Sequence, residues 1–266
     1  MLFTSTFTKV YFLTLAAILG ACMGSFLNCM AWRIVHGESV MNGRSHCDKC
    51  GHVLGVGDLV PVFSYLVHKG KCRWCGAKLS KLYLWSEIIS AAVFASIVYK
   101  FDISLNALQY LLWASLLLAC SFADLEGYII PDGFIIAAAV IRAVFILLSG
   151  NIVGELVFTL LGGIAVSAVL LIIVTLFEKA VGREAMGGGD IKLIFATGLY
   201  LGWQKNLLCL FVACILGILF AVATRKKREN QEDAKIFPFG PSIAASAWLC
   251  LLFGDRLIGW YIGLFY

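Results

Sequence analysis

Long apolar runs separated by short polar segments dominate the chain. Eight such runs occupy residues 10–32, 84–99, 105–123, 134–148, 152–177, 191–203, 207–223 and about 243–266. A helix that crosses a bilayer needs roughly 20 mostly apolar residues, and most of the runs approach that length. We therefore expect an all-α, polytopic helical membrane protein with about eight transmembrane helices and one long polar insertion at 33–83.

The composition strengthens this interpretation. Of the 266 residues, 61% are hydrophobic and only 14% are charged, whereas a soluble domain is typically about 25% charged. These figures exclude a disordered protein, a secreted disulfide scaffold and an ordinary cytosolic enzyme. The first run also loosely resembles a lipoprotein signal ending at Cys22, but its apolar character continues to Trp32. We therefore expect this run to be a retained span rather than a cleaved signal.

Basic residues are unevenly distributed along the chain. If each apolar run crosses once, sixteen of the 21 Lys and Arg residues fall on one side, chiefly in the 33–83 insertion and at 225–228. Membrane proteins keep such segments in the cytoplasm, so both termini are expected outside. A basic run can also bind nucleic acid, but these runs adjoin apolar spans and we expect no nucleic acid partner. Arg142 lies within a run, with Glu155 and Glu178 as candidate partners.

Four of the ten cysteines form two Cys-x-x-Cys pairs in the insertion, and each pair is followed by a glycine. The four residues are Cys47, Cys50, Cys72 and Cys75. Two such pairs can surround one Zn²⁺ ion tetrahedrally, with both thiolates of a pair reaching the metal. Redox pairs or disulfides are the alternative, but persistent disulfides are rare in the cytoplasm. We expect a small cytoplasmic insertion that binds a structural zinc ion.

Two acidic residues lie where apolar runs meet the expected cytoplasmic side. Asp124 ends the third run, and Asp190 precedes the sixth, directly after three glycines. Two carboxylates held close together share a proton, so that one can activate a water molecule, as in an aspartic protease. Gly187 and Gly189 lack a Cβ and would let a substrate approach Asp190. Lys192 could tune the local field, but we do not expect it to be catalytic.

Other interpretations of the two acids remain open at this point. An aspartate at the start of a helix is most often an N-cap, and acids in membrane helices also form proton pathways. The chain could therefore be a proton-coupled transporter that uses Asp124 and Asp190 as relays. A third alternative is a zinc-binding membrane assembly protein without catalysis. The chain has no His-Glu-x-x-His motif, which excludes that class of zinc metalloprotease.

Five segments, taken in order, resemble those of a known family, the type IV prepilin peptidases, which are GxGD-class membrane aspartic proteases. The segments are Gly24-Ser-Phe-Leu-Asn28 with Arg33; the insertion motifs Arg44-Ser-x-Cys47-x-x-Cys50, Asp58-Leu-Val-Pro61-x-x-Ser64-Tyr65 and Gly70-Lys-Cys72-Arg-x-Cys75; Asp124 followed by Ile130-Pro131-Asp132; Met186-Gly-Gly-Gly-Asp190 with Lys192; and Phe237-Pro-Phe-Gly-Pro241.

The resemblance implies a bifunctional enzyme in the bacterial cytoplasmic (inner) membrane, with its active site facing the cytoplasm. Asp124 and Asp190 would cleave the basic leader from prepilin or pseudopilin substrates at the start of their apolar helix. The new N-terminal residue would then be methylated with S-adenosylmethionine as the methyl donor. The implied parts are a first transmembrane helix at 1–32, a methyltransferase-associated Cys₄ insertion at 33–83, and a peptidase domain of about seven helices at 84–266.

The methyltransferase residues are less clearly marked. The family often has Tyr-Pro-x-x-Glu at the start of its second span, and here the segment from Tyr83 to Glu87 lacks the proline. Glu87 remains the best candidate for a methyltransferase residue. No glycine-rich nucleotide-binding loop of the Rossmann type is present, so the residues of the methyl-donor site cannot be derived from the sequence.

Overall fold

The computed structural model describes residues 6–40, 43–47, 49–183, 185–228 and 237–264, with the backbone alone at 225–228. The described residues form helices, two isolated β-bridges and no strands, which confirms the all-α prediction. The elements are α1 (Thr6–Val35), the 3₁₀ turn η1 (Val56–Leu59), α2 (Phe63–Val67), α3 (Lys81–Phe101), α4 (Leu105–Gly127), α5 (Asp132–Leu148), α6 (Ile152–Val181), α7 (Gly188–Arg228) and α8 (Gly240–Ile262).

The chain divides into two compact units, Met1–Glu126 and Gly127–Tyr266, each described here by itself. The first unit contains α1, the insertion, α3 and α4, and the second contains α5 to α8. The domain boundary expected after residue 83 stays a prediction. The side chains of the basic cluster at 225–228 lie outside the described residues.

Six of the described helices are long and apolar enough to cross a membrane, namely α1, α3, α4, α6, α7 and α8. The remaining long helix, α5, has 17 residues and is about 26 Å long, slightly short of the roughly 30 Å hydrocarbon core. The protein is therefore a multi-pass membrane protein, and its exact number of crossings stays a prediction.

The helix α7 reverses its direction in the middle. Gly202 has φ 73° and ψ 167°, a left-handed conformation that glycine adopts without strain. Asn206 Nδ2 donates to the carbonyl of Ile194 at 3.1 Å, although twelve residues of straight helix would span about 18 Å. The parts at 188–201 and 203–228 are therefore antiparallel arms. They correspond to the sixth and seventh apolar runs, which the sequence predicts as separate spans.

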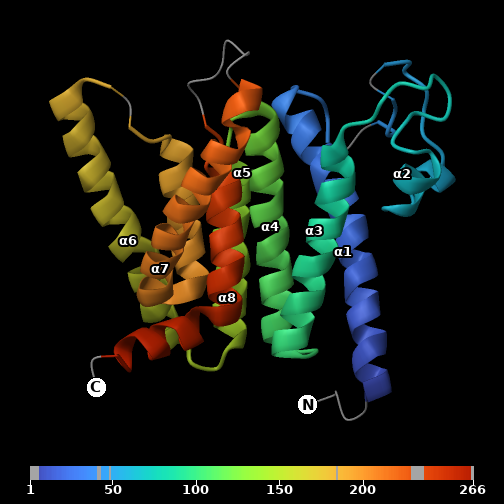
Figure 1. Cartoon of the computed structure of the whole chain (residues 1–266). Coiled ribbons are helices and arrows are strands. Elements are labelled where there is room, and N and C mark those ends of the chain that lie inside the picture. Colours follow the sequence, from blue (N-terminus) through green and yellow to red (C-terminus); the bar gives the residue numbers. More distant parts are fainter. Residues whose placement is uncertain (1–5, 41–42, 48, 184, 229–236, 265–266) are drawn as a thin grey trace. The chain divides into compact units, whose positions relative to one another are not determined.

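In the first unit, α1 and α3 lie side by side (Figure 1) and approach closely at small residues. A Cβ on Gly20 would lie 2.5 Å from the Ser90 carbonyl oxygen, and a Cβ on Gly24 would lie 2.5 Å from that of Ser86. The two glycines and the two serines each have a spacing of four residues, which places each pair on one helix face. This is the small-residue packing that lets membrane helices come into backbone contact.

In the second unit, the α7 hairpin and α6 meet around a buried polar side chain. Asn206 has no exposed surface and accepts from the Thr197 hydroxyl at 2.8 Å, while its amide donates to the carbonyls of Ile194 and Gly162. Gly162 and Gly198 face each other so closely that a Cβ on either would collide with the other's backbone. Because hydrocarbon offers no hydrogen bonds, these contacts fix the hairpin against α6.

The buried Arg142 of α5 forms an ion pair with Glu155 of α6. Its Nη2 donates to Glu155 Oε2 at 2.6 Å and its Nε donates to Thr159 Oγ1 at 2.9 Å. Glu155 was one of the two candidates from the sequence, and Glu178 instead accepts from the Ala185 backbone. An intramembrane charge is costly unless it is paired, so this pair both satisfies Arg142 and joins α5 to α6.

The close approach of α1 and α3 leads to a stability prediction. Replacing Gly20 with Leu should lower the apparent melting temperature of the purified protein in detergent by about 5 °C or more, because the new side chain forces the backbones apart. Gly259→Leu is the matched control, since a Cβ on Gly259 of α8 meets nothing within 4 Å. Equal melting temperatures for the two variants would contradict this packing.

Candidate functional site

The four cysteines of the insertion gather into one cluster. Their sulfur atoms all lie within 4.8 Å of one another, and the Cys47 and Cys75 sulfurs are 3.9 Å apart. Tetrahedral zinc–thiolate bonds of about 2.3 Å place neighbouring sulfurs about 3.8 Å apart. The donor set and its spacing therefore fit the predicted Cys₄ metal site.

Two similar turns build this cluster. The N–H of Gly51 donates to the Cys47 carbonyl at 2.8 Å, and that of Gly76 donates to the Cys72 carbonyl at 2.9 Å. Gly51 and Gly76 have φ of 69° and 70°, a region that residues with a Cβ rarely adopt. The glycine after each pair is therefore what folds both cysteines of that pair toward one point.

The chemistry of the cluster favours metal binding over a disulfide. All ten cysteines lie in the described part of the chain, and all are thiols. Hydrogen bonds from the backbone N–H groups of Cys75 and then of Trp74 lower the pKa of the Cys72 thiol to about 7. The Ala77 backbone N–H lowers the pKa of Cys75, but burial and hydrogen bonds with the neighbouring thiols outweigh it and raise that pKa to about 11. Thiolates are the metal-binding form of cysteine, so the fold favours this form at Cys72 and not at Cys75.

The insertion has almost no apolar core of its own. Among its described residues between 36 and 80, only Cys47 and Cys72 are buried. A segment of this size rarely folds on hydrophobic burial alone and usually needs a metal, disulfides or a partner surface. A structural metal at the cysteines would supply the missing constraint, and its presence stays a prediction.

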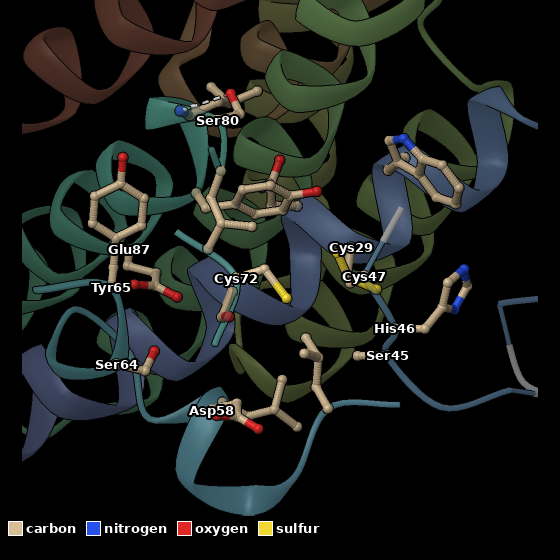
Figure 2. Close-up of a pocket in the computed structure, with 18 of the residues that line it drawn as sticks. Cys29, Ser45, His46, Cys47, Asp58, Ser64, Tyr65, Cys72, Ser80 and Glu87 are labelled. Atoms are coloured by element: carbon tan, nitrogen blue, oxygen red, sulfur yellow. Dashed lines mark hydrogen bonds between the residues drawn. The ribbon is translucent and has the colours of Figure 1, made fainter. Parts of the chain in front are cut away.

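A cavity of about 720 Å³ lies between the insertion, α1 and α3 in the first unit. Figure 2 shows Glu87 and Tyr65 on one side of it, and Cys47 and His46 on the other. Sites for small molecules typically have volumes of 300–1,000 Å³ with a few convergent polar groups. The cavity depends on contacts between segments far apart in the chain, and no sequence motif predicted it.

Glu87, the methyltransferase candidate, lies in the wall of this cavity. Its side chain is largely buried, and its Oε2 accepts from the backbone N–H of Val62 at 2.6 Å. Val62 has φ 62° and ψ −48°, a strained conformation for a β-branched residue. The carboxylate therefore holds a strained turn of the insertion against α3, and it is in place to meet a ligand in the cavity.

Asp124 lies near the end of α4 and is buried, with an exposed fraction of 6%. The last turn of α4 contains no basic side chain to offset the partial negative charge of a helix C-terminus. Burying a carboxyl group at this position is costly for folding. A functional role for Asp124 would explain that cost.

Asp190 lies inside the first turn of α7 rather than at the N-cap position. Its N–H donates to the Gly187 carbonyl at 3.0 Å. A Cβ on Gly187 would lie 3.3 Å from Asp190 Oδ2, and one on Gly189 would lie 3.1 Å from Ile130. The two glycines thus let the carboxylate fold back over the turn and let the turn pack against the segment before α5.

Lys192 forms an ion pair with Asp132. The Nζ of Lys192 lies 2.7 Å from Asp132 Oδ1, and both side chains are more than half exposed. Such an exposed pair contributes little to stability, but it links the first turn of α7 to the first turn of α5. Asp124 belongs to the first unit and Asp190 to the second, so their pairing stays a prediction.

Comparison with known proteins identifies two matching family models. The Bacterial Peptidase A24 N-terminal domain matches residues 18–101, and the Type IV leader peptidase family matches residues 111–222. No solved structure matches the chain.

Eight similar curated proteins share the name prepilin leader peptidase/N-methyltransferase. The relative from Bacillus subtilis is 32% identical over 253 residues, covering 94% of this chain and 98% of the relative. That from Aeromonas salmonicida is 32% identical over 225 residues, covering 84% and 76%. That from Pseudomonas putida is 30% identical over 272 residues, covering 93% and 92%.

The cysteine cluster makes a testable prediction. The protein purified without chelator should contain about one zinc ion per chain by elemental mass spectrometry, and Cys47→Ser should lose most of it because three ligands bind zinc far more weakly. Cys214→Ser is the matched control, since Cys214 is an exposed thiol of α7 outside the cluster. Equal zinc contents in both variants would remove the metal assignment.

Proposed function

Because the chain belongs to the type IV leader peptidase family, we propose that it removes the leader peptide from prepilin or pseudopilin substrates and methylates the new N-terminus. The single observation that carries this proposal is the similarity to prepilin leader peptidase/N-methyltransferases over nearly the whole chain. The protein would act in the bacterial cytoplasmic membrane, with its active site facing the cytoplasm, where a basic leader and an apolar helix meet.

Cleavage is assigned to Asp124 and Asp190 acting as an aspartic pair. The ionised carboxylate takes a proton from water as the water oxygen attacks the scissile carbonyl carbon, and the protonated carboxyl group donates a proton to the carbonyl oxygen. The tetrahedral intermediate then collapses: the peptide C–N bond breaks and a proton passes to the leaving amine. The buried setting of Asp124 and the glycine-rich turn of Asp190 support this assignment.

The glycines before Asp190 would admit the substrate backbone. Nothing lies within 4 Å of a Cβ built on Gly188, so an extended peptide can approach that position, while Gly187 and Gly189 shape the turn on either side. Lys192 would act through its ion pair with Asp132, which restrains the start of α7, and not by touching the substrate.

Methyl transfer is assigned to the cavity of the first unit. Its volume of about 720 Å³ and its mixed polar and apolar lining suit a nucleoside-sized ligand. S-adenosylmethionine, when bound, supplies the methyl group. The N-terminal ammonium of the cleaved substrate must lose a proton before it can be methylated, and the Glu87 carboxylate, oriented by the Val62 N–H, would accept it.

The metal at the cysteine cluster would serve this second activity indirectly. Cys47 and Cys72 contribute to the cavity wall as well as to the cluster. A Zn²⁺ ion bound by all four thiolates has no open position for catalysis. Its role would be to hold the two turns, and with them one wall of the cavity.

The aspartic assignment predicts the effect of two substitutions. In membranes that contain a prepilin, Asp124→Asn and Asp190→Asn should each slow leader removal by about a thousandfold or more, because neither variant can share the proton. Asp255→Asn should cleave normally, since Asp255 forms an ion pair with Lys205 elsewhere in the second unit. Leader removal is followed by gel shift, and wild-type rates in either active-site variant would reject the pair.

The methyltransferase assignment predicts a separation of the two activities. Glu87→Gln should release the leader at a rate close to wild type but reduce methylation of the mature N-terminus by about tenfold or more, because the amide cannot accept the proton. Intact-mass spectrometry of the mature pilin measures both steps in one sample. Glu178→Gln should leave both steps unchanged, since Glu178 accepts from the Ala185 backbone in the second unit.

A further inference from the structure

The segment of η1 and α2 exposes several apolar side chains. Val56, Leu59 and Val60 lie in or directly after η1, and Phe63, Leu66 and Val67 lie in α2. All six are exposed, from 43% for Leu59 and Val60 to 86% for Val56. We call these six residues the outward row.

The polar residues of the same segment face the other way. Asp58, Ser64, Tyr65 and His68 line the cavity and are less exposed than the row, of which Leu59 alone also lines the cavity. Asp58 accepts from the Gly55 N–H at 3.0 Å, and His68 Nε2 lies 3.7 Å from it. A surface helix in water shows the opposite arrangement, with its apolar face inward. The apolar and polar sides of this segment are therefore reversed relative to those of a water-exposed surface helix.

The contacts of Val62 place this segment alongside the membrane-spanning helices and not beyond their ends. Val62 binds Glu87, which lies about 9 Å along α3 from its first residue. The neighbouring Ser86 carbonyl lies against Gly24, which is about 16 Å along α1 from that helix's last residue. Figure 1 shows α2 beside the upper turns of α1 and α3. The segment therefore lies beside turns of α1 and α3, two helices that are long and apolar enough to cross a membrane.

Basic side chains follow the row directly. Lys69, Lys71, Arg73 and Lys78 are all exposed, and all but Lys69 also line the cavity. An apolar face next to Lys and Arg residues is the pattern of a segment that lies in the membrane interface and contacts anionic headgroups. The basic leader of the proposed substrate has the same sign of charge and would be repelled, so the charge favours lipid as the occupant.

We infer that the outward row is a membrane anchor that inserts into the boundary between headgroups and acyl chains of an anionic bilayer. The anchored segment forms one wall of the cavity, so the bilayer surface would support that wall from outside. The anchor itself needs only a multi-pass membrane protein, and only the exclusion of the leader as occupant rests on the proposed function.

Photo-crosslinking of the full chain in nanodiscs tests this anchor. Benzoylphenylalanine is introduced at Phe63, and the nanodiscs contain phosphatidylethanolamine and phosphatidylglycerol. Phe211 is the positive control, because it is an aromatic residue on the apolar helix α7 with the same 65% exposure as Phe63. Val53, exposed within the insertion but outside the row, is the negative control. The replacement at Phe63 preserves the aromatic ring, so folding should be retained.

We expect lipid adducts at Phe63 within about twofold of those at Phe211, and at least about fivefold above those at Val53. In nanodiscs of phosphatidylcholine alone, the Phe63 yield should fall about twofold or more while the Phe211 yield stays constant. Adducts at Phe63 no higher than at Val53, or no change on removing the anionic lipid, would overturn the inference. So would adducts to an added prepilin in place of lipid, which would make the row a substrate surface.

Discussion

Helices in hydrocarbon are not drawn together by the hydrophobic effect, so their association depends on close backbone packing and on a few buried polar contacts. The first unit relies on Gly20 and Gly24 of α1 against α3. The second relies on Gly162, Gly198 and the hydrogen bonds of Asn206. The helix packing of both units therefore depends on a few positions. At these positions either a glycine lets two backbones meet or a buried polar side chain has its hydrogen-bonding groups paired.

The same crossing that joins α1 to α3 also places the chemistry of the first unit. Ser86 contacts Gly24 through its carbonyl, and the next residue, Glu87, binds the strained turn at Val62. Because these contacts are adjacent along α3, any shift of α3 relative to α1 would move the carboxylate and the cavity wall together. The geometry of the proposed methyltransferase site therefore depends directly on the packing of α1 against α3. The Gly-rich turn at Asp190 plays the corresponding part in the second unit, where Gly189 packs on Ile130.

The sequence predicted what depends on local pattern. Apolar runs predicted the helices, including both arms of α7, and the Cys-x-x-Cys-Gly spacing predicted the cysteine cluster. It could not predict the cavity or the outward direction of Phe63, because these follow from the bond between Val62 and Glu87, 25 residues apart. The partner of Arg142 was narrowed to two acids, and only the packing of α5 on α6 selected Glu155. The pairing of Asp124 with Asp190 remains a prediction for the same reason: it depends on tertiary arrangement.

The insertion shows how a polar segment can be ordered without a core. Its only buried described residues are two cysteines, so burial of apolar area contributes little and other constraints must offset the entropy of ordering the chain. One is the hydrogen bond of Glu87 to the Val62 N–H, and the other two are those proposed above, metal binding at the thiolates and contact of the outward row with lipid. The metal would act on the wall that contains the cysteines, and the other two act on the wall formed by η1 and α2. Loss of one should therefore loosen one wall without unfolding the membrane helices, which are ordered independently by their own glycine contacts. That separation would allow the proposed methyltransferase activity to be lost without loss of the proposed peptidase activity.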